Sequence, residues 1–179
     1  MIFALALAAA LNLEPPSVRV SAEVNACANQ PQLAWCAKRS SAADAKPITE
    51  SVLLDYSKKT MRGFMLRNST ATGKDDIFQS FYADASAGKF WHGDCDNIVY
   101  TALEWLDADG YNMTDVYRVL VSTNGGEHFN HMVAVAVIDG QWMVFADSTR
   151  IGKVYPLDQA KWRPLYAAKN NTDKWYRNN

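Results

Sequence analysis

The chain has 179 residues, of which 49% are hydrophobic and 21% charged, and its formal net charge is -1. A chain of this length and composition can build one hydrophobic core of ordinary size, which excludes a disordered segment and a miniprotein held together by disulfides. Lysine and arginine are scattered along the sequence, so we expect neither a nucleic-acid partner nor a polybasic membrane anchor.

The N-terminus carries an apolar run from Met1 to Leu13. The run is too short to cross a bilayer as a helix, so we expect no stable membrane insertion, but its length suits the apolar part of an export signal. Small residues at 20–22 offer a cleavage site, although the run lacks the basic residues that usually begin such signals. We therefore predict a signal peptide over 1–22, an irregular segment over 23–46 and a folded domain over 47–179. The alternative is a buried N-terminal helix in a protein that is not exported.

Cysteine usage also favours an oxidising compartment. Eight residues separate Cys27 from Cys36, a spacing that suits a small disulfide loop, and Cys95 is then left as the odd thiol. The alternative is that Cys27 and Cys36 stay unpaired in a cytoplasmic protein.

Three helices are predicted in the first part of the domain. Apolar residues at helical spacing predict a helix over 47–67, and a second, short helix is expected over 75–85. Gly93-Asp94 then precedes an amphipathic run, which predicts a helix of about 13 residues from Cys95 to the Asp109-Gly110 pair.

The pattern changes to strands after this helix. Alternating apolar residues predict strands over 116–122, 131–138 and 141–146, and Asp139-Gly140 between the last two is a strong signal for a hairpin. Helices followed by antiparallel strands indicate an α+β domain in which the Cys95 helix packs on the sheet. The aromatic tail is expected to cover the core with Trp162, Tyr166, Trp175 and Tyr176.

Cys95, His131 and Asp147 are the residues best placed for chemistry. The positive end of a helix and a nearby imidazolium both stabilise a thiolate, and Cys95 has the first of these by its position. His131 opens a predicted strand and can supply the second. Antiparallel pairing across the hairpin places His131 opposite about position 148, which brings Asp147 alongside the imidazole that it would orient.

These residues lie in three short motifs: Gly93-Asp94-Cys95-Asp96 at a helix start, His131-Met132-Val133 at a strand start and Phe145-Ala146-Asp147 at a strand end. The motifs and their order resemble those of the bacterial transglutaminase-like cysteine proteinase family, over roughly residues 47 to 158. The resemblance implies a papain-like, transglutaminase-like core with the catalytic helix packed on an antiparallel sheet. It also implies that Cys95 is the nucleophile, His131 the general base and acid, and Asp147 the orienting carboxylate.

The best-studied members of that family are periplasmic, calcium-dependent proteases that cleave large surface adhesins. By this resemblance Asp94 and Asp96, which flank the cysteine, are candidate calcium ligands, and carboxylate oxygens suit this hard cation. The sequence departs from the family pattern at two positions, because Asp96 stands in place of a glutamate and Asn97 in place of an aspartate. Without a metal, Asp94 and Asp96 would act as a helix cap and a first-turn acid.

The sequence identifies only one of the two hydrogen-bond donors that would stabilise an oxyanion. The backbone N–H of Cys95 can supply one donor, but no second donor is obvious. Trp91 and Gln79 are candidates for that role, whereas His128 and His92 are candidate substrate contacts at the mouth of the cleft.

The predicted function is a thiol protease that cleaves an exported or surface protein through an acyl-enzyme thioester at Cys95. We expect a monomer in the periplasm or outside the cell, with calcium as its only cofactor. If an amine resolves the same thioester, the protein is a crosslinking transglutaminase. A non-catalytic structural or virion-associated module with the same fold, cytoplasmic or phage-associated, is a further alternative. Two other roles are possible for Cys95 itself. It could be a buried, inert thiol, or it could bind zinc together with His92, His128 and His131.

Overall fold

The computed structural model describes residues 11, 13–16, 44–66, 80–170 and 174–178. The predicted disulfide partners Cys27 and Cys36, and the candidate Gln79, lie outside these residues. Leu11 and strand β1 (Leu13–Pro16) fall within the predicted signal peptide, whose removal stays a prediction. No helix in the described ranges has the length and apolar character needed to cross a membrane.

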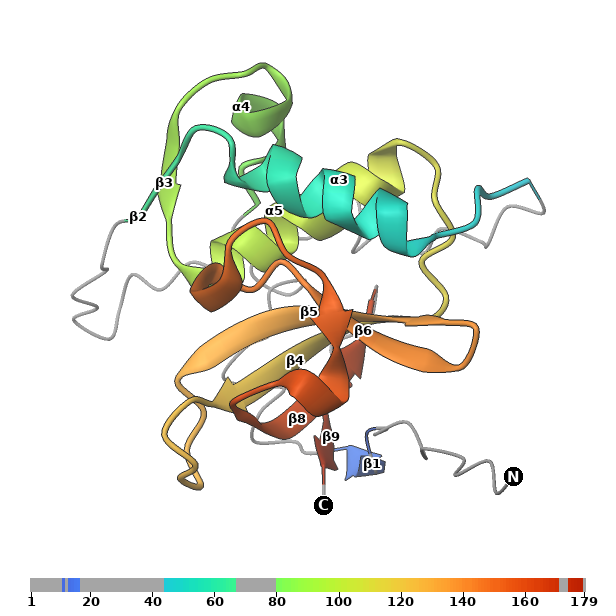
Figure 1. Ribbon diagram of the computed structural model, residues 1–179, viewed down its shortest axis with the longest axis vertical. Helices are drawn as coiled ribbons and strands as arrows, with labels where there is room; N and C mark the ends of the chain where they lie inside the picture. The colour runs from blue at the N-terminus through green and yellow to red at the C-terminus, as the bar shows by residue number, and fades with distance from the viewer. Residues whose placement is uncertain (1–10, 12, 17–43, 67–79, 171–173, 179) are drawn as a thin grey trace, which may run out of the picture.

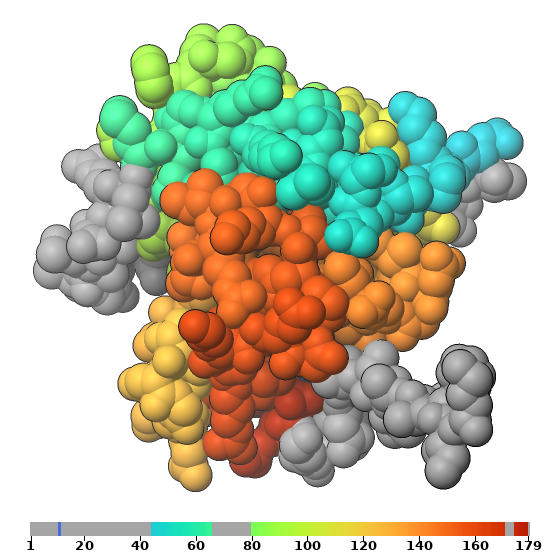
Figure 2. Space-filling model, viewed as in Figure 1, coloured from blue at the N-terminus to red at the C-terminus, as the bar shows by residue number. Residues whose placement is uncertain are grey.

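A helical layer lies on a sheet layer (Figure 1). The helices are α3 (Glu50–Met61), α4 (Tyr82–Ser86) and α5 (Cys95–Ala108). The main sheet has seven strands in the order β1-β9-β8-β4-β5-β6-β7, and every neighbouring pair is antiparallel. In space filling, the helical part sits directly on the strands (Figure 2). The predicted α+β class is confirmed.

The remaining elements are short. After β1, the strands of the main sheet are β4 (Val116–Ser122), β5 (His131–Ile138), β6 (Gln141–Phe145), β7 (Tyr155–Pro156), β8 (Arg163–Lys169) and β9 (Tyr176–Asn178). A separate parallel pair consists of β2 (Phe64–Leu66) and β3 (Trp91–Gly93). Two turns of 3-10 helix, η2 (Ser148–Arg150) and η3 (Leu157–Gln159), flank β7.

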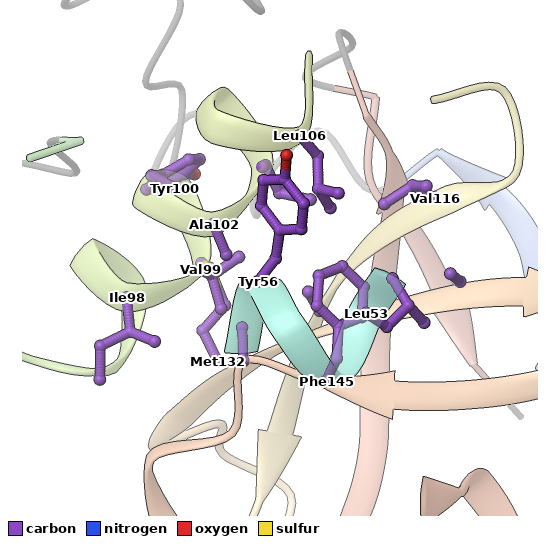
Figure 3. Close-up of a cluster of buried hydrophobic side chains, with 14 of the residues drawn as sticks. Leu53, Tyr56, Ile98, Val99, Tyr100, Ala102, Leu106, Val116, Met132 and Phe145 are labelled. Atoms are coloured by element: carbon purple, nitrogen blue, oxygen red, sulfur yellow. The ribbon is translucent and has the colours of Figure 1, made fainter. Parts of the chain in front are cut away.

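Helix α5 is buried on nearly all sides. Nine of its 14 residues are buried, because the helix lies between α3 and the sheet rather than on the surface. Figure 3 shows Leu53 of α3 near Phe145 and Val99 of α5 near Met132, and these residues belong to one buried cluster. The predicted packing of the Cys95 helix on the sheet is confirmed.

The first two predicted helices are shorter than expected. Helix α3 starts at Glu50, where the Thr49 hydroxyl caps it by accepting from the Val52 N–H at 3.3 Å. The helix ends at Met61 instead of 67, because Gly63 adopts a φ of +74° and turns the chain into β2. The helix predicted over 75–85 is seen only as α4, from Tyr82, and the part before residue 80 lies outside the described residues.

The hairpin forms as predicted. Asp139 and Gly140 both adopt positive φ, 50° and 78°, as a tight two-residue turn between twisted strands requires. Strand β6 ends at Phe145, one residue earlier than expected, because Ala146 also adopts a positive φ of 52° and leaves the sheet.

Both faces of the sheet are buried. Along β5, Met132 and Ala134 face α5, whereas Val133 and Val135 face a second apolar cluster on the opposite side. Burial on both faces explains why β5 reads as a nearly continuous apolar run. The second cluster also contains Val119, Val144, Tyr155, Leu157 and Trp162, and Trp162 and Trp175 are both buried, as expected for part of the aromatic tail.

We expect Leu103→Ala to lower the free energy of unfolding by about 2–5 kcal/mol, because it leaves a cavity between α5 and the sheet. Leu103 is 0% exposed, and its neighbour Glu104 is partly exposed, so Glu104→Ala is the matched control and should change stability by less than about 0.5 kcal/mol. Denaturant unfolding followed by tryptophan fluorescence measures both. Equal, small losses for the two variants would contradict a packed α5.

Candidate active site

Cys95 is the first residue of α5, as the sequence predicted. The side chain of Asn97 accepts a hydrogen bond from the Asp94 N–H at 3.0 Å, and the Asp94 side chain accepts one from the Asn97 backbone. A Cβ at Gly93 would lie 2.7 Å from Cβ and Oδ1 of Asn97. Glycine is therefore needed before the cap, and the departure from the family pattern at Asn97 serves the helix start.

The sulfur of Cys95 lies at the beginning of β5, where the backbone N–H of Met132 hydrogen-bonds to it. Val137 donates to the Asp115 carbonyl on the β4 side at 2.9 Å. Because N–H groups alternate along an antiparallel strand, the Met132 N–H points to the opposite side, toward β6. Strand β6 has already ended there, since Ala146 turns away, and the N–H is available to the sulfur.

The thiol of Cys95 is held in its protonated form. Burial raises its pKa, the negative charges of Asp96 and Asp94 raise it further, and the N–H groups of Met132 and Asp96 lower it only in part, which leaves the pKa at about 12. The expected stabilisation of a thiolate by the helix start is therefore outweighed in the protein without a bound cation. Two carboxylates beside a partly buried sulfur oppose a third negative charge.

His131 and Asp147 are joined by a hydrogen bond of 3.0 Å between Nε2 and Oδ1. The contact that the hairpin register predicted is thus confirmed. An ionised carboxylate only accepts, so Nε2 carries the hydrogen and Nδ1 is the ring nitrogen left to take up a proton. Within the part of the chain that the structure describes, no hydrogen bond joins Cys95 to His131, and Met132 is the link that brings the sulfur to the same end of β5.

Asp147 is buried, at 2% exposure, and surrounded by hydrogen-bond donors. Besides His131, Oδ1 accepts from the backbone N–H and the hydroxyl of Thr149, at 2.8 and 2.7 Å. Oδ2 accepts from the Tyr155 hydroxyl and from Trp162 Nε1, the latter at 3.3 Å. Burial by itself would raise the pKa of Asp147, but the hydrogen bonds from His131, Tyr155 and Thr149 outweigh it and hold the pKa well below its usual range.

The backbone before Asp147 is strained. Ala146 adopts a φ of 52°, in the left-handed region that costs a non-glycine residue about 1–2 kcal/mol. Such a conformation persists only where the surroundings hold it, and it occurs here at the residue that directs Asp147 toward His131. Sequence reasoning found Asp147 but not Thr149, Tyr155 or the contact of Trp162 with the carboxylate, because these donors depend on how β7 and the segment after η3 fold back.

The remaining predicted contacts occupy different environments. Trp91 is 2% exposed, and its ring stacks on Phe81 with centroids 5.4 Å apart. Its Nε1–H is buried without a hydrogen-bond partner among the described residues. His128, in the β4–β5 turn, and His92, in β3, are both exposed. The roles of these three residues stay predictions.

One group of side chains in the described ranges has the geometry to hold a metal ion: Asp94, Cys95 and Asp96, whose ligand atoms lie within 4.8 Å of one another. Asp96 is 5% exposed, so its charge is largely removed from water. The group is rich in carboxylate oxygen, which suits calcium better than zinc. His92 and His128 do not join it, and the zinc site considered as an alternative does not form.

The comparisons with known proteins show the fold. No protein-family model matches the chain, and no curated protein matches it. Among solved structures, calcium-bound LapG of Legionella pneumophila is similar with a TM-score of 0.52 and 18% identity, over 71% of this chain and 68% of LapG. A second structure of Legionella pneumophila LapG gives a TM-score of 0.51 and 17% identity, over 87% of this chain and 76% of LapG. LapG is a transglutaminase-like cysteine protease with a papain-like core, so the fold that the motifs implied is confirmed.

We expect Asp147→Asn to lose about 1.5–3 kcal/mol of stability at pH 7, because hydrogen bonds to a charged group are lost. A carboxyl whose folded pKa lies below its ordinary value of 3.8 stabilises the fold above pH 3.8 and loses that contribution as the pH falls toward its folded pKa. The stability difference between wild type and Asp147→Asn should therefore shrink below pH 3.8. Urea unfolding at several pH values measures it, with the exposed Asp158→Asn as control, and a difference independent of pH would contradict the charged, hydrogen-bonded state.

Proposed function

We propose that the protein is a cysteine peptidase that uses Cys95, His131 and Asp147 as a catalytic triad. The observation that carries the proposal is the junction at the start of β5. The Met132 N–H binds the Cys95 sulfur there, and the preceding residue, His131, is oriented by Asp147. The structural likeness to LapG, a cysteine protease, supports the class of reaction.

The triad would act by acyl transfer. Asp147 holds the Nε2–H of His131, so Nδ1 takes the proton of the Cys95 thiol as the sulfur attacks the carbonyl carbon of the substrate. The imidazolium then gives this proton to the departing amine, the C–N bond breaks, and a thioester remains. Water, deprotonated by His131, hydrolyses the thioester to a carboxylic acid and regenerates the thiol.

Two donors are proposed for the oxyanion. The backbone N–H of Cys95 lies in the first turn of α5, where N–H groups have no partner within the helix. Trp91 Nε1–H supports the second assignment, because a buried donor without a partner among the described residues is costly unless it is used.

The substrate is proposed to be a polypeptide with apolar residues near the scissile bond. Among the described residues, the large apolar side chains that are exposed are Phe90 at 76%, Ile151 at 61% and Met65 at 43%. Phe90 lies five residues before Cys95 and Ile151 four residues after Asp147. Met65 is paired with His92 in the strand pair that leads to Cys95. Exposed apolar side chains of this size favour contact with another polypeptide where they lie close together.

Calcium is proposed as the cofactor, held by Asp94 and Asp96. The donor set fits, because both side chains offer carboxylate oxygen and Asp96 is nearly buried. Bound calcium would supply positive charge beside the thiol, where these carboxylates now raise the pKa of Cys95. The similar LapG structure in its calcium-bound form supports the assignment. An exported, periplasmic location is proposed with it, in line with the signal peptide predicted over 1–22.

Alkylation of Cys95 by iodoacetamide tests the triad without a known substrate. In the presence of calcium we expect Cys95 to react at pH 6 at least about tenfold faster than free cysteine, since an ordinary thiol is almost fully protonated at this pH. With a chelator the rate should fall, because burial and the charges of Asp96 and Asp94 then raise the thiol pKa with no bound cation to counter them. Mass spectrometry separates the label on Cys95 from labels on Cys27 and Cys36.

His131→Ala should abolish the rapid labelling. Val133→Ala is the matched control, because Val133 is a buried neighbour on the same face of β5 and its truncation leaves the imidazole in place. A rate that follows an ordinary thiol titration in both variants and in wild type would refute the triad. Release of peptides from a protein substrate, against incorporation of a fluorescent amine, then separates hydrolysis from transglutamination.

Calcium should raise the melting temperature of the wild-type protein, because a ligand that binds only the folded state stabilises it. Asp96→Asn removes one of two carboxylates and is expected to abolish most of this shift, whereas the exposed Asp158→Asn should keep it. Scanning calorimetry with calcium, magnesium or a chelator measures the shift. The same shift in Asp96→Asn as in wild type would place the cation elsewhere.

A further inference from the structure

We propose that Tyr155 and Trp162 are positioning residues of the candidate triad, which hold Asp147 by one oxygen so that the other faces His131. The inference rests on the proposed function and adds two residues that the triad motif does not contain. It follows from how the donors around the Asp147 carboxylate are divided between its two oxygens.

The two oxygens of Asp147 are bound from different parts of the chain. Oδ1 receives His131 Nε2 at 3.0 Å and the two donors of Thr149, which follows two residues later. Among the described residues, Oδ2 receives the Tyr155 hydroxyl and Trp162 Nε1, from β7 and from the segment after η3. Rotation of the carboxylate about its Cβ–Cγ bond is broad and nearly two-fold unless both oxygens are held. Tyr155 and Trp162 therefore fix the plane of the group that faces the imidazole.

Both residues act on Asp147 only as donors. Burial and the hydrogen bond to Asp147 raise the pKa of the Tyr155 hydroxyl, so it stays protonated. The indole of Trp162 has no acceptor atom. Neither residue can exchange a proton with Asp147 near neutral pH, so their contribution to the site is orientation and stabilisation of the charge.

Tyr155 and Trp162 lie in the second apolar cluster, on the face of the sheet turned away from α5. Tyr155 is 5% exposed and Trp162 is 9% exposed, so water has little access to replace a lost donor. Arg150 packs on the ring of Tyr155, with its guanidinium 4.1 Å from the ring centroid. The same guanidinium donates a hydrogen bond to the Gln159 carbonyl at 2.9 Å. Loss of either donor would thus leave Oδ2 with a single partner.

The orientation of Asp147 decides which nitrogen of His131 is protonated. While Oδ1 faces the ring, the hydrogen is kept on Nε2, and Nδ1 stays free to accept the thiol proton. If the carboxylate turns away, the Nδ1–H form of the imidazole gains population, and this form cannot take the proton from Cys95 at the same nitrogen. A purely structural role of Tyr155 and Trp162 would not change the tautomer.

Nitrogen NMR of the imidazole rings tests the proposal on the full-length protein. The chain has three histidines, and the exposed His92 and His128 serve as internal references for His131. We expect the Nε2–H form of His131 in wild type and a gain of the Nδ1–H form in Tyr155→Phe and in Trp162→Phe. Tyr117→Phe is the matched control, because Tyr117 is buried on the same face of the sheet and its ring packs on Trp142. It should leave the tautomer unchanged.

The rate of Cys95 alkylation with calcium at pH 6 gives the second readout. We expect it to fall about tenfold or more in Tyr155→Phe and Trp162→Phe, as is typical when a partner that orients a functional side chain is removed, and to stay unchanged in Tyr117→Phe. Should Tyr155→Phe fail to fold, Trp162→Phe, which loses the longer bond of 3.3 Å, gives the same readouts.

The outcomes separate the positioning role from the proposed function. Folded variants that keep the wild-type tautomer and alkylation rate would overturn the positioning role and leave the triad intact. Wild-type labelling that does not depend on His131 would refute the triad, and the tautomer measurement would still show whether Tyr155 and Trp162 orient the pair of His131 and Asp147.

Discussion

Burial of α5 against the start of β5 is the interaction on which the arrangement of the site depends. A helix covered by α3 on one side and by the sheet on the other has little freedom to shift, because any displacement opens a void in the core. Its first turn is further fixed by the cap between Asp94 and Asn97 and by the close approach of Gly93. The position of Cys95 is therefore set by packing and capping, before any chemistry of the thiol is considered.

The acidic side chains of the site have opposite electrostatic surroundings at its two ends, Asp147 at one and Asp94 and Asp96 at the other. The charge of Asp147 is balanced by neutral donors and an imidazole, so the carboxylate is favourable where it lies. Asp94 and Asp96 instead flank a partly buried sulfur, whose ionisation they oppose. The carboxylates beside Cys95 thus disfavour its thiolate, whereas the carboxylate beside His131 is matched by donors. A cation bound as proposed by Asp94 and Asp96 would favour the thiolate of Cys95.

The sequence was most informative where local patterns determine the structure. The glycine and acid before Cys95 predicted the start of α5, and the Asp139-Gly140 turn predicted a register that places His131 beside Asp147. Strands β2 and β3 could not be predicted, because three-residue strands acquire their pairing from segments far apart in the chain. The roles of Cys95, His131 and Asp147 remain predictions that biochemical measurements must test.

Contacts that depend on tertiary folding were also beyond sequence reasoning. The aromatic tail was expected to cover the core, yet nothing in the sequence indicated that the indole of Trp162 donates to Asp147. The high pKa of Cys95 is a second example, since the helix end alone suggests the opposite direction. In both cases the result depends on how deeply a group is buried and on which charges lie beside it, quantities that a motif does not contain.

The pairing of β1 with β9 links the N-terminus to the architecture of the sheet. Residues 13–16 form the outermost strand, next to β9, and they belong to the segment predicted to be cut off during export. In the precursor β1 is the edge strand, and its Pro15 and Pro16 have no N–H to donate. Cleavage after residue 22 would remove β1 and make β9 the edge strand in its place. Exposed edges of this kind recruit further strands. The precursor and the mature protein would then differ in their capacity for edge-to-edge association, although the triad itself would be the same in both.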